Sequence, residues 1–254
     1  MARRFGLLGL GCVLVLAGSL LAWAIQTAGG VRVTDVRFPA PGGAVMSGLL
    51  YMPPGVDAAH PAPAVLASHG YINTREMQSP FAIELSRRGF VVLAMDMTGH
   101  GYSTGNVGAD GFGGPAALAY LQSVPGVDRS NIGLEGHSMG GMVAAHHAAG
   151  ADSGWAGVVL SSAALVLPQN VTAGKARVLA SLAAVAPNQG LEAMDEKLVL
   201  RDSAQQAALM QDPLIHHEKL PARTVATLLD GIQTLQARMP DIKAPLLLLH
   251  GQKD

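Results

Sequence analysis

Cysteine and charge are both scarce in this 254-residue chain, and each scarcity excludes a kind of chemistry. The single cysteine, Cys12, lies inside an apolar run, so we expect neither a disulfide nor thiol chemistry in the folded domain. Charged residues make up 14% of the chain, and 17 Lys and Arg against 18 Asp and Glu leave a net charge of -1. That balance provides no basic field for nucleic acid and no acidic tail, so neither kind of partner is expected.

Apolar residues are abundant and make up 49% of the sequence. A chain of this length and composition buries one substantial core, and α/β domains of this size are commonly single. No internal repeat, charge block or low-complexity segment divides the chain. We therefore expect one domain over residues 30–254, after an N-terminal segment of residues 1–29.

The N-terminal segment has the composition of a membrane-inserting sequence. Arg3 and Arg4 precede an apolar run from Phe5 to Ile25, which as a helix would be roughly 31 Å long and would reach across a bilayer. The two charges predict a cytoplasmic N-terminus, with the domain anchored on the extracytoplasmic side or secreted. Ala22-Trp23-Ala24 fits a small-x-small cleavage site, so a removed signal peptide and a retained anchor both stay open. A twin-arginine signal or a buried first helix of the domain would also fit this run.

From residue 31 onward, short β-type runs alternate with segments of helical period. Continuous apolar strands are typical of a parallel sheet covered on both faces, so the pattern predicts an α/β fold with a mostly parallel central sheet. Strands are expected at residues 31–38, 45–52, 64–68, 90–94, 132–134, 157–161 and 245–249, and helices at 80–88, 114–124 and 139–149. The stretch between the last two strands has helical patterns and no strand signal, which predicts a helical cap over about 163–243.

One pentapeptide has the pattern of a nucleophile elbow. Residues 136–140 have the pattern G-x-S-x-G, and they lie between an apolar run that ends near Leu134 and a helix-forming stretch from Met139 onward. A serine hydroxyl needs a base and oxyanion donors nearby, and a sharp strand-to-helix turn presents Ser138 to both. Side chains at Gly136 and Gly140 would collide with the neighbouring strand and helix. An ordinary helix N-cap is the plainer interpretation of Ser138.

Four motifs in the correct chain order strengthen the first interpretation. They are S-H-G-Y at 68–71, D-M-T-G-H-G-Y-S at 96–103, G-H-S-M-G-G at 136–141 and P-L-L-L-L-H-G-Q-K-D at 245–254. With these motifs the chain resembles the α/β-hydrolase family, and more narrowly its serine hydrolases of the monoacylglycerol-lipase and S33-peptidase-like type. The resemblance covers roughly Val31 to Asp254.

The resemblance implies a catalytic triad in the order serine, acid, histidine. Ser138 would attack the substrate, and Asp254 would orient the histidine. The backbone N–H groups of Tyr71 and Met139 would form the oxyanion hole. Because no histidine follows Asp254, we expect the catalytic histidine, a final strand and a final helix to lie outside this chain. We therefore expect the chain to be C-terminally truncated and, as it stands, nearly inactive and poorly folded.

Several residues are expected to shape the site without reacting: His69, Gly70, Gly136, Gly140 and Asp96. Gly70 lets the backbone turn across the mouth of the sheet, so its substitution should be more harmful than that of Tyr71. Asp96 lies at a strand end, as a catalytic acid would, but the family pattern implies that it stabilises the glycine turn after it.

The remaining polar residues of interest have no single interpretation. His216 and His217 in the predicted cap are the candidates for a base within this chain. Adjacent residues on a helix do not share a face, so no metal site is expected at the histidine pairs. Glu135 lies where such strands are usually apolar, and a buried carboxylate there needs a partner or a raised pKa.

The functional hypothesis for the complete protein is a cofactor-free serine hydrolase that cleaves lipid-like or short acyl esters through an acyl-enzyme. Its partners would be a small-molecule ester and, through the N-terminal segment, a membrane. A peptidase or amidase of the same fold and a cofactor-free haloperoxidase are the enzymatic alternatives. A non-catalytic, membrane-tethered fragment that binds a ligand through the cap is the alternative from another class.

Overall fold

The computed structural model of the chain describes residues 2–27, 30–71, 73–150, 154–167, 171–191, 202–211 and 219–252. Its centre is a sheet with the strand order β1-β2-β4-β3-β5-β6-β7. The strands are β1 (Arg32–Pro39), β2 (Val45–Met52), β3 (Ala62–Ser68), β4 (Val91–Asp96), β5 (Val127–His137), β6 (Val158–Ser161) and β7 (Leu246–Leu249). β2 pairs antiparallel with β1 and with β4, and the other neighbouring strands are parallel. The mostly parallel sheet predicted from the sequence is confirmed.

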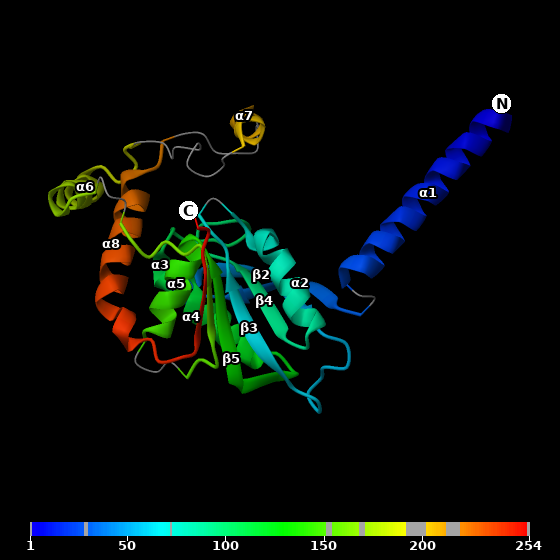
Figure 1. Ribbon diagram of the computed structural model, residues 1–254, viewed down its shortest axis with the longest axis horizontal. Helices are drawn as coiled ribbons and strands as arrows, with labels where there is room; N and C mark the ends of the chain where they lie inside the picture. Colours follow the sequence, from blue (N-terminus) through cyan, green and yellow to red (C-terminus); the bar gives the residue numbers. More distant parts are fainter. Residues whose placement is uncertain are drawn as a thin grey trace.

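Helices lie on both faces of this sheet (Figure 1). The α-helices are α1 (Ala2–Thr27), α2 (Ser79–Arg87), α3 (Ala109–Phe112), α4 (Gly114–Ser123), α5 (Met139–Ala148), α6 (Ala173–Val185), α7 (Ser203–Gln211) and α8 (Ala222–Arg238). Short 3-10 helices are η1 (Pro41–Gly43), η2 (Arg75–Gln78) and η4 (Met239–Asp241). α2 covers one face, and α4, α5 and α8 contribute to the core on the other.

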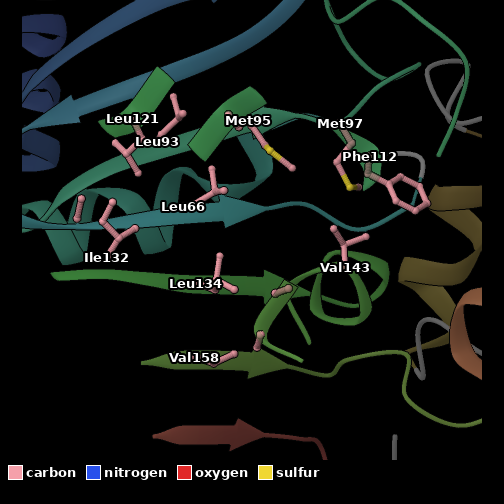
Figure 2. Packing of buried hydrophobic residues seen from close by; sticks show 14 of the residues in the cluster. Leu66, Leu93, Met95, Met97, Phe112, Leu121, Ile132, Leu134, Val143 and Val158 are labelled. Carbon is pink, nitrogen blue, oxygen red and sulfur yellow. The ribbon is translucent and has the colours of Figure 1, made fainter. Parts of the chain in front are cut away.

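The core follows from the alternation of side chains along each strand. Leu93, Leu66, Leu134 and Val158 are partners in register on β4, β3, β5 and β6. They form one row across the sheet, as Figure 2 shows, and all are at most 2% exposed. The residues next to them in sequence point to the opposite side of the sheet, toward α2, where a second buried cluster forms. Both faces of the central strands are therefore buried, which explains their continuous apolar sequences.

The connection order fixes where a ligand can bind. From β3 the chain passes through α2 to β4, which is the neighbour of β3 on one side. It then returns past β3 to β5, which is the neighbour of β3 on the other side. In open α/β sheets the crevice at such a reversal, outside the carboxyl ends of the strands, is the usual ligand site. Ser68 and Gly136 are partners at these two strand ends. The residues that follow them, from 69 and from 137, therefore meet at this crevice.

The segment predicted as the cap, 163–243, contains α6, α7 and α8. In Figure 1, α6 and α7 lie away from the sheet, whereas α8 packs beside α5. α8 buries Leu229, Ile232 and Leu235, so it belongs to the core as well as to the cap segment.

Helix α1 projects away from the rest of the molecule (Figure 1). Its stretch from Gly6 to Ile25 has a mean hydropathy of 2.3, and none of it is buried. By length and composition alone, this helix could cross a membrane. At its end, Arg87 Nη2 on α2 donates a hydrogen bond to the Ile25 carbonyl at 2.8 Å.

Candidate functional site

Ser138 occupies a tight turn between β5 and α5. Its backbone angles are φ 54° and ψ -119°, a conformation that non-glycine residues rarely adopt. The Ser138 amide donates to the Ser161 carbonyl at 3.0 Å, and the Ser138 carbonyl accepts from the amides of Gly141 and Ala164, each at 3.0 Å. The surrounding backbone thus holds the turn on several sides, with the Ser138 side chain half-buried at the carboxyl edge of the sheet.

The two glycines of the turn are required by close backbone contacts. A Cβ atom at Gly136 would lie 2.2 Å from the Gly140 carbonyl oxygen, and one at Gly140 would lie 2.1 Å from the Ser68 carbonyl oxygen. Neither position can hold a side chain without moving backbone. The absence of side chains brings the start of α5 against the end of β3.

The segment after β3 packs directly on this turn. A Cβ atom at Gly70 would lie 3.3 Å from Ser138 Cβ, which places the start of the Tyr71 loop beside the serine. Met139 is the first residue of α5, so its amide has no acceptor within the helix. The Tyr71 hydroxyl is hydrogen-bonded to Thr224 of α8, and burial raises the pKa of this phenol. The structure therefore brings Gly70, Tyr71 and Met139 together with Ser138.

His69 forms a bridge between two strand ends. Its side chain is fully buried, with Nδ1 2.7 Å from the Gly70 carbonyl oxygen and Nε2 3.1 Å from the Met97 amide nitrogen. A carbonyl only accepts and an amide N–H only donates, so the proton is on Nδ1 and Nε2 accepts. Burial lowers the pKa of His69 to about 4, which keeps the ring neutral at neutral pH.

Asp96 supports the loops from the end of β4. Its carboxylate is fully buried and accepts the Arg75 amide on Oδ1 at 2.8 Å and the Tyr102 amide on Oδ2 at 3.0 Å. A Cβ atom at Gly101 would lie 2.3 Å from Asp96 Oδ1. Both carboxylate oxygens therefore accept hydrogen bonds from backbone amides, and Gly101 packs directly against the carboxylate.

None of the described histidines is hydrogen-bonded to Ser138, and three of them contact other groups. His137 Nδ1 lies 3.2 Å from Ser161 Oγ, His146 Nε2 lies 2.7 Å from the Gly231 carbonyl and His147 Nε2 lies 3.2 Å from the Gly111 carbonyl. Over the described ranges, no hydrogen bond joins Ser138 Oγ to a histidine, and no group of three His, Cys, Asp or Glu could hold a metal ion. Asp254, His216 and His217 lie outside the described residues.

Glu135 is buried on the other side of β5 from Leu134. Its residue is 1% exposed, and neither carboxylate oxygen has a hydrogen-bond partner among the described residues. Burial raises the pKa of this carboxyl to about 8. It lines a hollow of about 410 Å³ on the α2 side, together with residues such as Val65, Phe90 and Val159. Ser138, Tyr71 and Met139 do not line this hollow, so its volume does not identify the reactive site.

A different hollow, of about 360 Å³, lies beside the serine turn. It is lined by Leu160, Ala163, Ala164, Leu165, Val166, Leu248, Leu249 and His250. Ala164 also donates its amide to the Ser138 carbonyl, which places this apolar surface next to the turn.

Arg75 supports the site although no sequence pattern indicated it, and its charged side chain is only 4% exposed. Apart from Glu76, the next residue, whose Oε1 accepts from Arg75 Nε at 3.0 Å, its partners lie 21 to 40 positions away. No spacing rule reveals contacts at such distances. The only available signal was a charged residue five positions before the helix predicted at 80–88, in the loop that carries Tyr71.

The sheet topology and the serine turn together define the class of protein. It is an α/β-hydrolase-fold serine hydrolase. Residues 59–254 match the family described as serine aminopeptidase, S33, and the chain belongs to that family.

Curated relatives of the chain include monoacylglycerol lipases. That of Mycolicibacterium smegmatis is 30% identical over 206 residues, which cover 76% of this chain and 71% of the relative. The monoglyceride lipase of Homo sapiens is 29% identical over 199 residues, with 76% of this chain and 66% of the relative covered. The chain thus spans just under two thirds of the human protein.

The structural comparison agrees with the fold. The crystal structure of the monoacylglycerol lipase of Paleococcus ferrophilus superposes with a TM-score of 0.62 at 23% identity, covering 87% of this chain and 77% of that one. The expected α/β-hydrolase fold and the expected class, an ester-cleaving serine hydrolase, are confirmed. The peptidase alternative has no better support.

Proposed function

We propose that Ser138 is the nucleophile of an esterase that acts on lipid-like acyl esters at a membrane surface. The observation that carries this proposal is the strained Ser138 conformation between β5 and α5, with Gly136 and Gly140 closed against backbone. Strain of this kind persists only where the surrounding structure enforces it, and it gathers at reactive residues. An ordinary helix N-cap needs no such conformation, and the Ser138 side chain makes no capping hydrogen bond to α5.

The proposed chemistry has two steps. Ser138 Oγ bonds to the ester carbonyl carbon while its proton passes to a histidine, and the tetrahedral oxyanion accepts hydrogen bonds from the Tyr71 and Met139 amides. When the ester C–O bond breaks, the histidine returns the proton to the leaving alcohol, and water later hydrolyses the acyl-enzyme. Asp254 would orient the histidine. That the histidine follows Asp254 in a longer chain stays a prediction.

The apolar surroundings of the turn support a lipid-like substrate. The 360 Å³ hollow next to the serine turn is lined almost entirely by aliphatic side chains. Ser138 does not line it, and the Ala164 amide connects its wall to the turn, so it offers apolar surface for an acyl chain near the serine rather than a pocket for the reacting carbonyl. In the cap segment, Val178 and Val185 of α6 are 67% and 83% exposed, so the cap also presents apolar surface. The relatives are monoacylglycerol lipases, and we propose a monoacylglycerol or a similar single-chain ester for this protein too.

Helix α1 supports the membrane part of the proposal. Its apolar stretch of 20 residues suits either a retained anchor or a signal sequence, and the preceding Arg3 and Arg4 favour a domain on the extracytoplasmic side.

The test is turnover by the purified full-length protein of acyl esters of increasing chain length and of aminoacyl amides. We expect esters to be preferred, and Ser138→Ala to reduce kcat by about a millionfold. Ser123→Ala, at the exposed end of α4, is the matched control and should keep wild-type turnover. A preference for aminoacyl amides would support the peptidase alternative, and ester turnover that survives Ser138→Ala would refute the assignment of the nucleophile.

A further inference from the structure

Arg75 is a buried cation in the middle of the candidate site's supporting loops. It is the first residue of η2, which connects the Tyr71 loop to α2. Its side chain is only 4% exposed, and a guanidinium removed from water is costly unless its donors are satisfied. The contacts of this side chain therefore show what it holds in place.

The guanidinium reaches the outer strands of the sheet. Its Nη1 and Nη2 donate to the two Asp35 carboxylate oxygens of β1, at 2.9 and 2.7 Å. Nη1 also lies 2.8 Å from Ser47 Oγ and 3.0 Å from the Gly48 carbonyl oxygen, both on β2. The paired contact with Asp35 fixes the orientation as well as the position of the planar group.

The backbone of the same residue is tied to β4. The Arg75 amide donates to Asp96 Oδ1 at 2.8 Å, and the other Asp96 oxygen accepts the Tyr102 amide at 3.0 Å. The Arg75 guanidinium also lies over the Tyr102 ring, 5.0 Å from its centroid. One residue thus connects the Tyr71 loop to three strands and to the glycine turn after β4.

The rest of η2 and the start of the loop are also held. Gln78 Nε2 donates to the Ser68 carbonyl at 2.6 Å, and Gly70 packs against the Ser138 turn. Tyr71 lies one residue after Gly70 and four residues before Arg75. The Tyr71 backbone is therefore held on both sides, by Gly70 before it and by Arg75 after it. Of these two residues, only Arg75 acts through a side chain that contacts several strands.

We infer that Arg75 is a positioning residue that fixes the Tyr71 amide for the oxyanion through its contacts with Asp35, β2 and Asp96. This inference rests on the proposed function for its catalytic consequence. Lysine cannot replace arginine here, because an ammonium group cannot form the paired contact with Asp35 while also reaching β2. A misplacement of about 1 Å in such a donor can cost about a hundredfold in rate.

The first measurement does not depend on activity. Amide hydrogen exchange over residues 68–79 of the full-length protein should be about tenfold faster in Arg75→Lys than in wild type, while exchange over α5 stays unchanged. Arg88→Lys, on an exposed side chain of the same charge, is the matched control and should leave both segments unchanged. Unchanged exchange over 68–79 in Arg75→Lys would overturn the inference.

The second measurement separates positioning from general stability. Arg75→Lys should lower kcat for an ester by about tenfold or more and change KM by less than about twofold, because only the transition state uses the oxyanion donor. Asp35→Asn, which keeps the Asp96 and β2 contacts, should have a smaller effect in the same direction. If Arg75→Lys changed kcat and KM by equal factors, or left kcat at the wild-type value, the positioning role would be contradicted. If the wild type turns over no ester, the proposed function fails, and the exchange measurement still decides the inference about Arg75.

Discussion

Replacing Glu135 by glutamine tests the buried carboxyl directly, whatever the substrate of the protein. In the register of the sheet, Glu135 lies between Ala67 of β3 and Val159 of β6, and its two oxygens find no partner in the described part of the chain. Burial raises its pKa from the ordinary value of 4.5 to about 8. The folded protein therefore holds a proton that the unfolded chain releases at much lower pH.

The sign of the effect on stability follows from this proton. Below about pH 4.5 both states are protonated, so the carboxyl costs nothing. As the pH rises from 4.5 to about 8, the carboxyl ionises only in the unfolded state, so the free energy of unfolding falls. Above about pH 8 the carboxyl ionises in both states, and the free energy of unfolding falls no further on its account. A difference of 8 minus 4.5, at about 1.4 kcal/mol per pH unit, gives a loss of ~5 kcal/mol at most. That is a large part of the stability of a typical domain.

Urea unfolding at pH 5, 6, 7 and 8 measures this loss. We expect Glu135→Gln to become progressively more stable than wild type as the pH rises, because the amide does not titrate. Buried His69 acts in the opposite direction, but it is present in both proteins and cancels in the comparison. Glu84→Gln, at an exposed carboxylate on α2, should keep the wild-type pH dependence. A constant difference between Glu135→Gln and wild type from pH 5 to 8 would refute the argument from burial.

Two further substitutions test the backbone of the site. Gly140→Ala places a Cβ atom 2.1 Å from the Ser68 carbonyl oxygen, so we expect the free energy of unfolding to fall by about 2 to 3 kcal/mol and ester turnover to be lost. Gly174→Ala is the control: the nearest atom to its Cβ is 3.9 Å away, and it should change neither quantity. Equal stability of the two variants in urea would contradict the clash. Asp96→Asn turns an amide N–H toward a backbone donor and should cost about 1 to 3 kcal/mol. If Asp96 were the triad acid, stability would instead persist while kcat fell about ten-thousandfold.

Most of the sheet could be predicted because its strands are short, apolar and separated by turn residues. The hairpin of β1 and β2, the helix that ends before Gly89 and the helix after Ser138 all have local signals. β5 was predicted only at 132–134, although it extends over Val127–His137. Its residues 129–131 are polar and exposed, so hydrophobic pattern alone could not include them.

Contacts between distant parts of the chain could not be predicted. The sequence places α8 in the cap because an apolar helical pattern does not say which surface the helix covers, yet Ile232 and Leu235 pack into the core. The Arg75 network joins residues from β1, β2 and β4 to one loop. Helical and strand periodicities relate only near neighbours in sequence, so neither set of contacts could be predicted from them.

Asp96 and Asp254 both come at or after the end of an apolar strand in the sequence, and the described structure gives a role to Asp96. Both oxygens of Asp96 accept backbone amides beneath Gly101, whereas a triad acid must offer an oxygen to an imidazole N–H. β7 is parallel to β6 and β5, so its carboxyl end lies at the edge of the sheet where Ser138 is presented. Asp254 follows the last residue of β7 by five positions. Asp254 as the acid that orients the base therefore stays a prediction, and Asp96 holds the loops around Ser138.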